Sequence, residues 1–243
     1  TKNKKNILCS ICMRGGSKGV KNKHLRKINK KTLIWHSIFQ AKKSNLFDKI
    51  VVSTDSREIQ RISLQSGADK VFIRPQYMAR DHSPKLPVIR HVFKKAENFY
   101  KKNFDVLIDL DATSPLRVVK DIRNAYKLFI KNKSPNLISA CLSKKNPYFN
   151  ILECKNKKII ISKKLLKIPG SRQQAPITYD MNASIYIWNR KTILKTDELF
   201  FKNTSLYLMP EERSIDIDSE LDFKLVKLLM EKDINEKKII NLD

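Results

Sequence analysis

Apolar segments and helical patterns alternate along the first 141 residues. Short continuous apolar runs predict strands buried on both faces, and apolar residues three or four positions apart predict helices between them. Strands that alternate with helices indicate an α/β fold with a mostly parallel sheet and helices on both of its faces. The expected strands are 7–12, 49–53, 70–73, 106–110 and 137–141, and the expected helices are 32–44, 56–65, 86–100 and 121–130.

The regular alternation stops after residue 141 and resumes near residue 183. The segment between them contains a hairpin-like stretch at 150–161 and a loop with proline and glycine. We therefore expect one α/β domain formed by residues 1–141 and 179–243, with an inserted arm at 142–178. The elements expected after the arm are a strand at 183–188, a short strand at 204–209 and a helix at 219–231.

The composition predicts a folded domain. Hydrophobic residues make up 41% of the 243 residues and charged residues 30%, which argues against disorder. No segment approaches the stretch of about 18 apolar residues that a membrane helix needs. The first residues are polar and lysine-rich and lack the apolar run of a signal peptide, so we expect a cytoplasmic protein.

The formal net charge of +26 has two interpretations. It can indicate a polyanionic partner such as nucleic acid, or it can reflect a lysine-rich composition without a binding role. The lysines are spread along the chain, and the aromatic residues show no interleaved stacking pattern. We favour the second interpretation and expect neither a nucleic-acid nor a membrane partner, while a basic nucleic-acid-binding protein stays as the less favoured alternative.

Cys9 and Cys12 form a C-x-x-C pattern inside an apolar run. Residues three apart on a strand point to opposite faces, so a buried strand is favoured over a redox or metal site. The remaining cysteines, Cys141 and Cys154, do not complete a disulfide scaffold or a zinc spacing.

The densest chemical signal directly follows the first expected strand. Three glycines within six residues let the backbone approach a ligand closely, and main-chain N–H groups in such a turn bind anions. Cationic side chains within and after the turn suit a polyphosphate, although the pattern is neither a Walker sequence nor a dinucleotide fingerprint. The residues are Arg14, Gly15, Gly16, Ser17, Lys18 and Gly19, followed by Lys23.

Two pairs of aspartates indicate a divalent cation or a polar substrate. Asp109 and Asp111 stand at the end of an expected strand, and Asp216 and Asp218 share one face of an extended segment. Carboxylate oxygens beside a phosphate loop suit Mg²⁺. Asp218 has an equally weighted alternative as the N-cap or first-turn acid of the helix that follows, and Asp55 or Ser56 is favoured as the cap of the helix at 56–65.

These segments, in this order, resemble the CMP-sialic acid synthetases, or acylneuraminate cytidylyltransferases. The resemblance runs from about residue 6 to about residue 230 and rests on the joint pattern rather than on one motif. It implies a Rossmann-like nucleotidyltransferase fold, an arm that reaches across a homodimer, and transfer of CMP from CTP to a nine-carbon nonulosonic acid with Mg²⁺. The segments are RGGSKG, VVSTD, the region of Arg74 and Asp81, ATSPLR, RQQ-x-P, N-x-x-IYI and SIDID.

The resemblance also assigns roles to residues. It implies that Arg14, Lys23 and Asp218 are catalytic and that Asp216 and Asp218 hold Mg²⁺. The implied CTP contacts are Arg14, Gly15, Gly16, Ser17, Lys18, Lys23, His24, Arg74, Asp81 and Ser83. The implied sugar contacts are Asp111, Thr113, Ser114, Asn150, Arg172, Gln173, Asp180 and Asn182.

The chain departs from the usual sialate pattern at several of these positions. His24 stands where the family usually has Asn, and Asp111, Asn150 and Asp180 stand where other polar or cationic residues are common. The forms DLDATSPLR and YDMNASIYI are more similar to the branch that acts on legionaminic acid. We therefore expect N,N'-diacetyllegionaminic acid first, with N-acetylneuraminic acid and pseudaminic acid as alternatives. An enzyme for an eight-carbon 3-deoxy sugar acid would lack RQQ and N-x-x-IYI.

Overall fold

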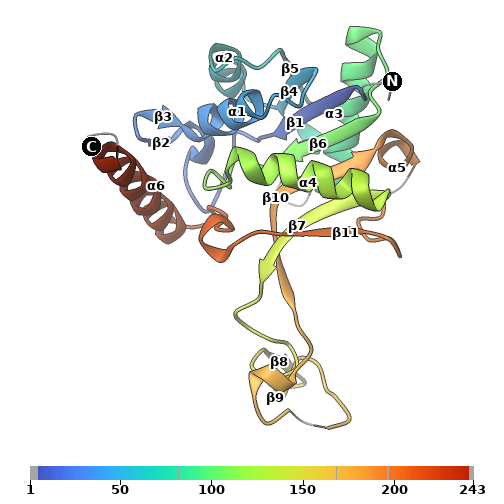
Figure 1. Ribbon diagram of the computed structural model, residues 1–243, viewed down its shortest axis with the longest axis vertical. Helices are drawn as coiled ribbons and strands as arrows, with labels where there is room; N and C mark the ends of the chain where they lie inside the picture. Colours follow the sequence, from blue (N-terminus) through green and yellow to red (C-terminus); the bar gives the residue numbers. More distant parts are fainter. Residues whose placement is uncertain (1–4, 81–82, 168, 196, 241–243) are drawn as a thin grey trace.

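A seven-stranded sheet forms the centre of the computed structural model, which describes residues 5–80, 83–167, 169–195 and 197–240 (Figure 1). The strand order is β11-β7-β10-β6-β1-β4-β5. β10 runs antiparallel to both of its neighbours, and the other neighbouring strands are parallel. The strands are β1 (Ile7–Cys12), β4 (Lys49–Thr54), β5 (Lys70–Ile73), β6 (Val106–Leu110), β7 (Asn136–Leu142), β10 (Tyr179–Asn189) and β11 (Ser205–Leu208).

Helices cover both faces of this sheet, which confirms the expected α/β class. Alternate side chains of β1 pack into two apolar cores, one on each face of the sheet. Ile7 and Ile11 pack with α1, α2 and α4, whereas Leu8 packs with α3 and α5. A strand buried on both sides is mostly apolar along its length, which explains the run, and the one polar residue in it, Ser10, is hydrogen-bonded to Asp109. The helices are α1 (Leu33–Ser44), α2 (Arg57–Gln65), α3 (Lys85–Tyr100), α4 (Val119–Asn132), α5 (Arg190–Lys195) and α6 (Glu220–Ile240).

Capping residues fix where two of the helices begin. The hydroxyl of Thr32 accepts a hydrogen bond from the amide of Trp35, and Ser56 caps α2 through the amide of Ile59. Both residues had been counted in the expected helices, so each helix begins one residue later. Ser56, and not Asp55, is therefore the cap of α2.

The largest differences from the expected elements lie in the C-terminal third. The expected strand at 183–188 is the inner part of β10, which begins at Tyr179 and shifts register between Met181 and Tyr186. Ala183 adopts a positive φ of 51° within this irregularity, so the alternation of side chains breaks there. α6 extends to Ile240 rather than ending near residue 231.

The insert forms an arm that projects from the sheet, carried by the ends of β7 and β10 (Figure 1). Its hairpin consists of β8 (Leu152–Lys155) and β9 (Lys158–Ile161), joined by two residues with positive φ, Asn156 and Lys157. Such a two-residue turn matches the twist of paired strands. The hairpin and its turn confirm the expected elements of this segment.

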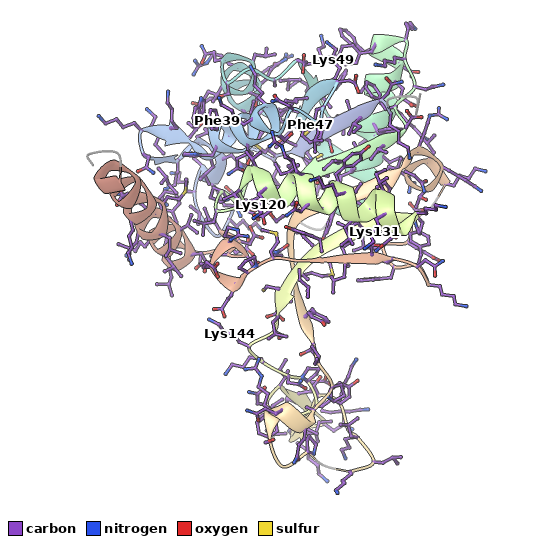
Figure 2. The ribbon with its side chains drawn as sticks, in the orientation of Figure 1. Phe39, Phe47, Lys49, Lys120, Lys131 and Lys144 are labelled. Atoms are coloured by element: carbon purple, nitrogen blue, oxygen red, sulfur yellow. The ribbon has the colours of Figure 1, made fainter. Side chains whose placement is uncertain are left out.

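The placement of the cysteines agrees with the sequence interpretation. Of the lysines, Lys120 and Lys131 are exposed near the two ends of α4, and Lys144 is exposed on the chain that leads from β7 into the arm (Figure 2). Cys9 and Cys12 pack toward opposite faces of the sheet, and all four cysteines are free thiols. None of the helices in the described ranges has the length and apolar character that crossing a bilayer requires.

Candidate active site

A cavity of about 330 Å³ lies at the carboxyl ends of the central strands. In open α/β sheets this edge is where ligands bind, because the loops of neighbouring strands meet there. Five segments supply its walls: the loop after β1, the chain after β5, the start of α3, the loop after β6 and the segment before α6. The lining residues are Cys12, Arg14, Ser17, Lys18, Gly19, Lys23, His24, Arg74, Met78, Arg80, Ser83, Lys85, Val88, Asp111, Thr113, Asp216 and Asp218.

The glycine loop is held in a compact turn. The Ser17 hydroxyl donates to the carbonyl of Val20 at 2.8 Å and accepts from the amide of Lys23 at 3.2 Å. The Gly15 amide donates to the carboxylate of Asp55 at 2.9 Å. Asp55 thus anchors the start of the loop, and the Gly15 N–H points at this carboxylate rather than into the cavity.

Gly19 joins the glycine loop to the aspartate segment. A Cβ atom at this position would lie 2.0 Å from the carbonyl oxygen of Asp218, which is far inside van der Waals contact. Lys23 crosses the same junction, since its Nζ donates to the carbonyl of Ile217 and lies 3.2 Å from Asp218 Oδ1. The two segments, almost 200 residues apart in sequence, therefore form one wall of the cavity.

The residues of this wall fit a divalent cation. Asp216 Oδ1 is buried and has no hydrogen-bond partner among the described residues. Burial, reinforced by the charges of Asp111 and Asp218, raises the pKa of Asp216 to about 6. A buried carboxylate oxygen without a donor is satisfied by a cation, and Mg²⁺ takes one or two carboxylates together with phosphate and water oxygens.

A larger protein cage for a metal ion is absent from the described part of the chain. No group of three or more His, Cys, Asp or Glu side chains is placed there to hold one. Two aspartates that complete their coordination with phosphate oxygens remain compatible with this finding.

The alternative role of Asp218 as a helix cap is wrong. Ser219 takes that position: its hydroxyl accepts from the amide of Asp222 at 3.2 Å, and the Asp222 carboxylate accepts from the Ser219 amide at 2.7 Å. This reciprocal arrangement is a capping box. The Asp218 side chain is 77% exposed and lines the cavity.

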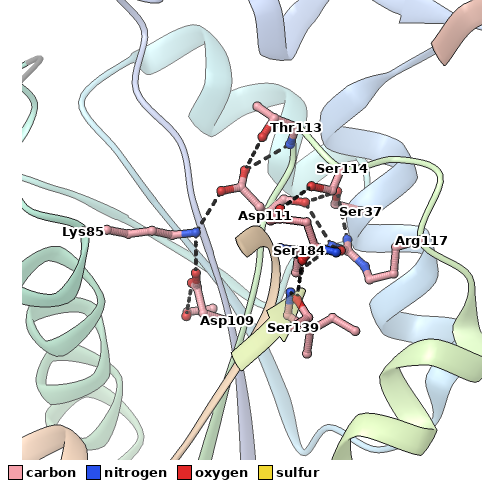
Figure 3. A network of polar contacts seen from close by, with 12 residues as sticks. Ser37, Lys85, Asp109, Asp111, Thr113, Ser114, Arg117, Ser139 and Ser184 are labelled. Carbon is pink, nitrogen blue, oxygen red and sulfur yellow. Dashed lines mark hydrogen bonds and ion pairs between the residues drawn. The ribbon is translucent and has the colours of Figure 1, made fainter. Parts of the chain in front are cut away.

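An ion cluster of Lys85, Asp109 and Asp111 forms part of the cavity wall, where the sequence predicts only aspartates (Figure 3). Lys85, the first residue of α3, reaches 2.8 Å from Asp111 Oδ2 and 3.3 Å from Asp109 Oδ2. Ser10 donates to the other oxygen of Asp109 at 2.6 Å, and Thr113 donates twice to the other oxygen of Asp111. Lys85 was not among the expected site residues, and nothing in its local sequence marks it.

Opposing effects set the pKa values in this cluster. Burial alone would lower the pKa of Lys85, but Asp111 and Asp109 together raise it well above its usual value. Burial would raise the pKa of Asp111, but Lys85 and the hydrogen bonds from Thr113 lower it overall. Asp109 is fully buried, and for it burial prevails and raises the pKa. Asp111 is therefore ionised and Lys85 protonated at neutral pH.

Arg117 supports the loop that follows β6. Its buried guanidinium donates to the carbonyls of Asp111 at 3.2 Å and Ser184 at 2.7 Å, and to the side chain of Gln40 at 3.1 Å (Figure 3). Burial lowers its pKa to about 10, which still leaves it protonated at neutral pH. The end of the ATSPLR segment is thus a structural brace.

Three of the residues expected near the nucleotide, Arg74, Ser83 and His24, also line the cavity. Arg74 is buried and donates to the carbonyls of Met13 and Ser53, so it also ties together the chain after β1 and the end of β4. Ser83 donates to the carbonyl of Tyr77 at 3.0 Å. Burial lowers the pKa of His24 to about 4, because it outweighs the charge of Asp111 and is reinforced by the nearby cations, so this imidazole is neutral at pH 7. Asp81 lies outside the described residues.

The expected sugar contacts of the insert do not line this cavity. Asn150, Arg172 and Gln173 lie in the arm, and Arg172 and Gln173 line a separate cavity of about 360 Å³ at its base. Asp180 is exposed on β10 beside the arm. These four assignments therefore receive no support from the geometry of a single chain.

Asn182 and Ser114 are internal supports rather than cavity walls. The Asn182 amide donates to Ser214 at 3.0 Å, and its oxygen accepts from Ser139 at 2.6 Å. Ser114 is fully buried and donates to the Asn182 carbonyl. In this chain both residues connect β10 to the loops that carry the cavity. Of the expected sugar contacts, only Asp111 and Thr113 face it.

A cationic glycine loop, a buried carboxylate suited to a cation and a cavity at a strand edge define a nucleotide-binding α/β enzyme. The family model described as cytidylyltransferase matches residues 8–239, and the chain belongs to that family. It is therefore a CTP-dependent nucleotidyltransferase, as the sequence resemblance implied.

Named relatives and a solved structure agree with this assignment. The chain is 49% identical to the CMP-N,N'-diacetyllegionaminic acid synthase of Campylobacter jejuni, over 92% of this chain and 94% of the relative. It is 48% identical to the post-translational flagellin modification protein B of Campylobacter coli, over 95% and 98%. Its fold is similar to that of a CMP:2-keto-3-deoxy-manno-octonic acid synthetase complexed with CTP, with a TM-score of 0.68 at 15% identity, over 94% of this chain and 99% of that one.

Proposed function

We propose that this protein transfers CMP from CTP to a nonulosonic acid, N,N'-diacetyllegionaminic acid, and releases pyrophosphate. The observation that carries the proposal is one cavity in which the cations Arg14, Lys18 and Lys23 face Asp111 and Asp216. The cations suit a triphosphate, and the carboxylates suit a cation and a sugar rich in hydroxyl and amide donors. The 49% identical legionaminate synthase supports the choice of sugar.

In the proposed reaction, the anomeric hydroxyl oxygen of the sugar forms a bond to the α-phosphorus of CTP. The bond from that phosphorus to the bridging oxygen breaks, pyrophosphate leaves with the bond's electrons, and the hydroxyl proton passes to solvent. Such a transfer depends on positioning and on charge neutralisation. Arg14 and Lys18 bind the leaving phosphates in this proposal, and Lys23 stabilises charge at the α-phosphate.

Asp216 and Asp218 are the proposed holders of Mg²⁺. When bound, the ion supplies Lewis-acid polarisation of phosphate oxygens and acidifies a bound hydroxyl. Lys23 Nζ lies 3.2 Å from Asp218 Oδ1, so the protein itself supplies a cation beside this carboxylate. No described histidine is proposed as a base, and His24, with a pKa of about 4, offers neutral hydrogen-bonding atoms to the nucleotide.

We propose a homodimer in which the arm of one subunit packs against the other. Large apolar side chains are exposed on the arm and on the adjoining part of β10. Their exposure to water is unfavourable in a monomer and supports an interface at this surface. Leu152, Ile159 and Ile177 are 63%, 65% and 71% exposed. In such a dimer Asn150, Arg172, Gln173 and Asp180 are free to serve the partner's cavity. The proposal locates the reaction in the cytoplasm, where CTP is available.

Competition between sugars tests the choice of substrate. Purified protein receives limiting CTP and equal amounts of N,N'-diacetyllegionaminic acid and N-acetylneuraminic acid, and the two CMP-sugars are quantified by mass spectrometry. We expect the legionaminate product to exceed the other by about a hundredfold, because each buried polar group left unpaired by the wrong sugar costs about 1–3 kcal/mol. A preference for N-acetylneuraminic acid would contradict the proposed sugar but not cytidylyl transfer.

A further inference from the structure

The ion cluster of Lys85, Asp109 and Asp111 stands at the cavity wall. In it, two carboxylates share one ammonium group (Figure 3). A buried charge is costly unless it is paired, so a cluster of three is kept where its charges are needed. Lys85 is 32% exposed and Asp111 17%, whereas Asp109 is fully buried.

Lys85 lines the cavity, but its ammonium group is engaged by protein groups. Its ammonium lies between the two carboxylates and 5.0 Å from the centre of the Tyr186 ring, which is within cation–π range. It also holds its proton firmly, because both aspartates raise its pKa. These properties exclude Lys85 as a general base and make it an anchor.

Asp111 is held by Lys85, and its carboxylate has one hydrogen-bond acceptor site left. Its carboxylate accepts three hydrogen bonds from described groups, one from Lys85 and two from Thr113. An ionised carboxylate has about four lone-pair sites. Because Asp111 lines the cavity, the remaining site is available to a donor on a bound molecule.

We infer that Lys85 is a positioning residue that fixes Asp111 as a fully ionised acceptor for a hydroxyl or amide N–H donor of the sugar. The inference rests on the proposed function and deepens it. A fixed anion at this place attracts a donor-bearing part of the sugar and repels the sugar's own carboxylate.

Steady-state kinetics of four proteins test this inference. KM for the sugar and KM for CTP are measured separately in the wild type and in Lys85→Met, Asp111→Asn and the double variant. We expect each single variant to raise the sugar KM about tenfold while the CTP KM stays within about twofold, because one charge-assisted hydrogen bond is lost. The double variant should match Asp111→Asn alone, because Lys85 acts through Asp111.

Lys94→Met is the matched control, since Lys94 is exposed on the same helix and lies outside the cavity wall. Lys85→Arg keeps the charge and should recover most of the sugar KM. If Lys85→Met fails to fold by circular dichroism, Lys85→Gln replaces it in the wild-type and Asp111→Asn backgrounds, and a change in the sugar KM of equal size in both contradicts the inference.

Two other results would overturn it: a Lys85→Met variant with the wild-type sugar KM, or single-variant effects that multiply in the double variant. Neither result would affect the proposed function, which fails separately if the wild-type protein releases no pyrophosphate with any nonulosonic acid.

Discussion

At the scale of single residues, the site depends on charges that the chain brings together from distant segments. Lys23 is the clearest case, because its ammonium contacts the carboxylate of Asp218 and the carbonyl of Ile217 from the other end of the sequence. Lys23 therefore supports the cavity wall, and in the proposed reaction it also presents a positive charge to a bound phosphate.

Lys23→Ala tests this double role. We expect kcat to fall by at least about a hundredfold, as when one preorganised donor to a developing charge is removed. Circular dichroism should remain that of the wild type. Lys21→Ala is the control, since Lys21 is an exposed neighbour that does not line the cavity. Wild-type turnover in a folded Lys23→Ala protein would contradict the assignment.

Asp216→Asn and Asp218→Asn test the proposed Mg²⁺ site. Each variant should raise the Mg²⁺ concentration that gives half-maximal pyrophosphate release, because an amide is a weaker ligand than a carboxylate. Asp216→Asn should not destabilise the metal-free protein. It removes the charge of a buried carboxylate, and Oδ1 of that carboxylate has no hydrogen-bond partner among the described residues. If both magnesium titrations superimpose on that of the wild type, the two residues have another role.

His24 makes a prediction about pH. Its pKa is lowered from 6.5 to about 4, chiefly by burial, so between these values the unfolded chain binds a proton that the folded chain does not. Stability therefore falls as the pH drops from 6.5 toward 4, by up to about 3 kcal/mol from this group.

His24→Asn removes that contribution, so its free energy of unfolding should depend less on pH across this range. Urea denaturation at a series of pH values measures the slope. The slope is independent of any uniform loss of stability caused by the substitution. Parallel curves for the two proteins would show that His24 is not buried as a neutral group.

At the scale of elements, the strands of the N-terminal half could be predicted closely and the long-range contacts could not. β1 and β6 have their expected bounds because a strand buried on both faces requires a mostly apolar run. β5, a partly exposed strand at the edge of the sheet, also has its expected bounds. The capping box of Ser219 and Asp222 follows a short sequence signature and could have decided the role of Asp218. Lys85 could not be found, because its partners are set by the order of strands in the sheet.

The contact between the glycine loop and the aspartate segment makes a prediction at this scale. Gly19→Ala places a Cβ against the Asp218 carbonyl, so we expect it to lower the free energy of unfolding by about 1–3 kcal/mol. Gly16→Ala is the matched control for stability, since a Cβ there meets no heavy atom within 4 Å. Chemical denaturation of both variants checks this, and equal losses would show that the two segments are not packed together.

At the scale of the whole molecule, the proposed role of the arm involves a second copy of the chain. The break in the alternation after residue 141 predicts the position of the arm in the sequence. The direction of the arm could not be predicted, because the register shift in β10 leaves no periodic signal in the sequence. The expected sugar contacts Arg172 and Asp180 therefore lie away from the cavity of their own chain.

Ile159→Glu tests whether the arm is a dimer contact. A charge in the centre of an apolar interface is costly, so we expect the variant to sediment as a monomer at concentrations where the wild type is a dimer. Lys157→Glu, in the turn of the same hairpin, is the control and should remain dimeric. A wild-type protein that is monomeric at every concentration would contradict the proposed assembly.

The most direct test of the central claim is pyrophosphate release from CTP by the purified wild-type protein. The assay contains Mg²⁺ and N,N'-diacetyllegionaminic acid, and parallel reactions omit the sugar or replace CTP with UTP, ATP or GTP. We predict rapid release only when CTP and the sugar are both present, with one CMP-sugar formed for each pyrophosphate. Release that does not require a nonulosonic acid, or none with any member of a panel of such acids, would contradict the account.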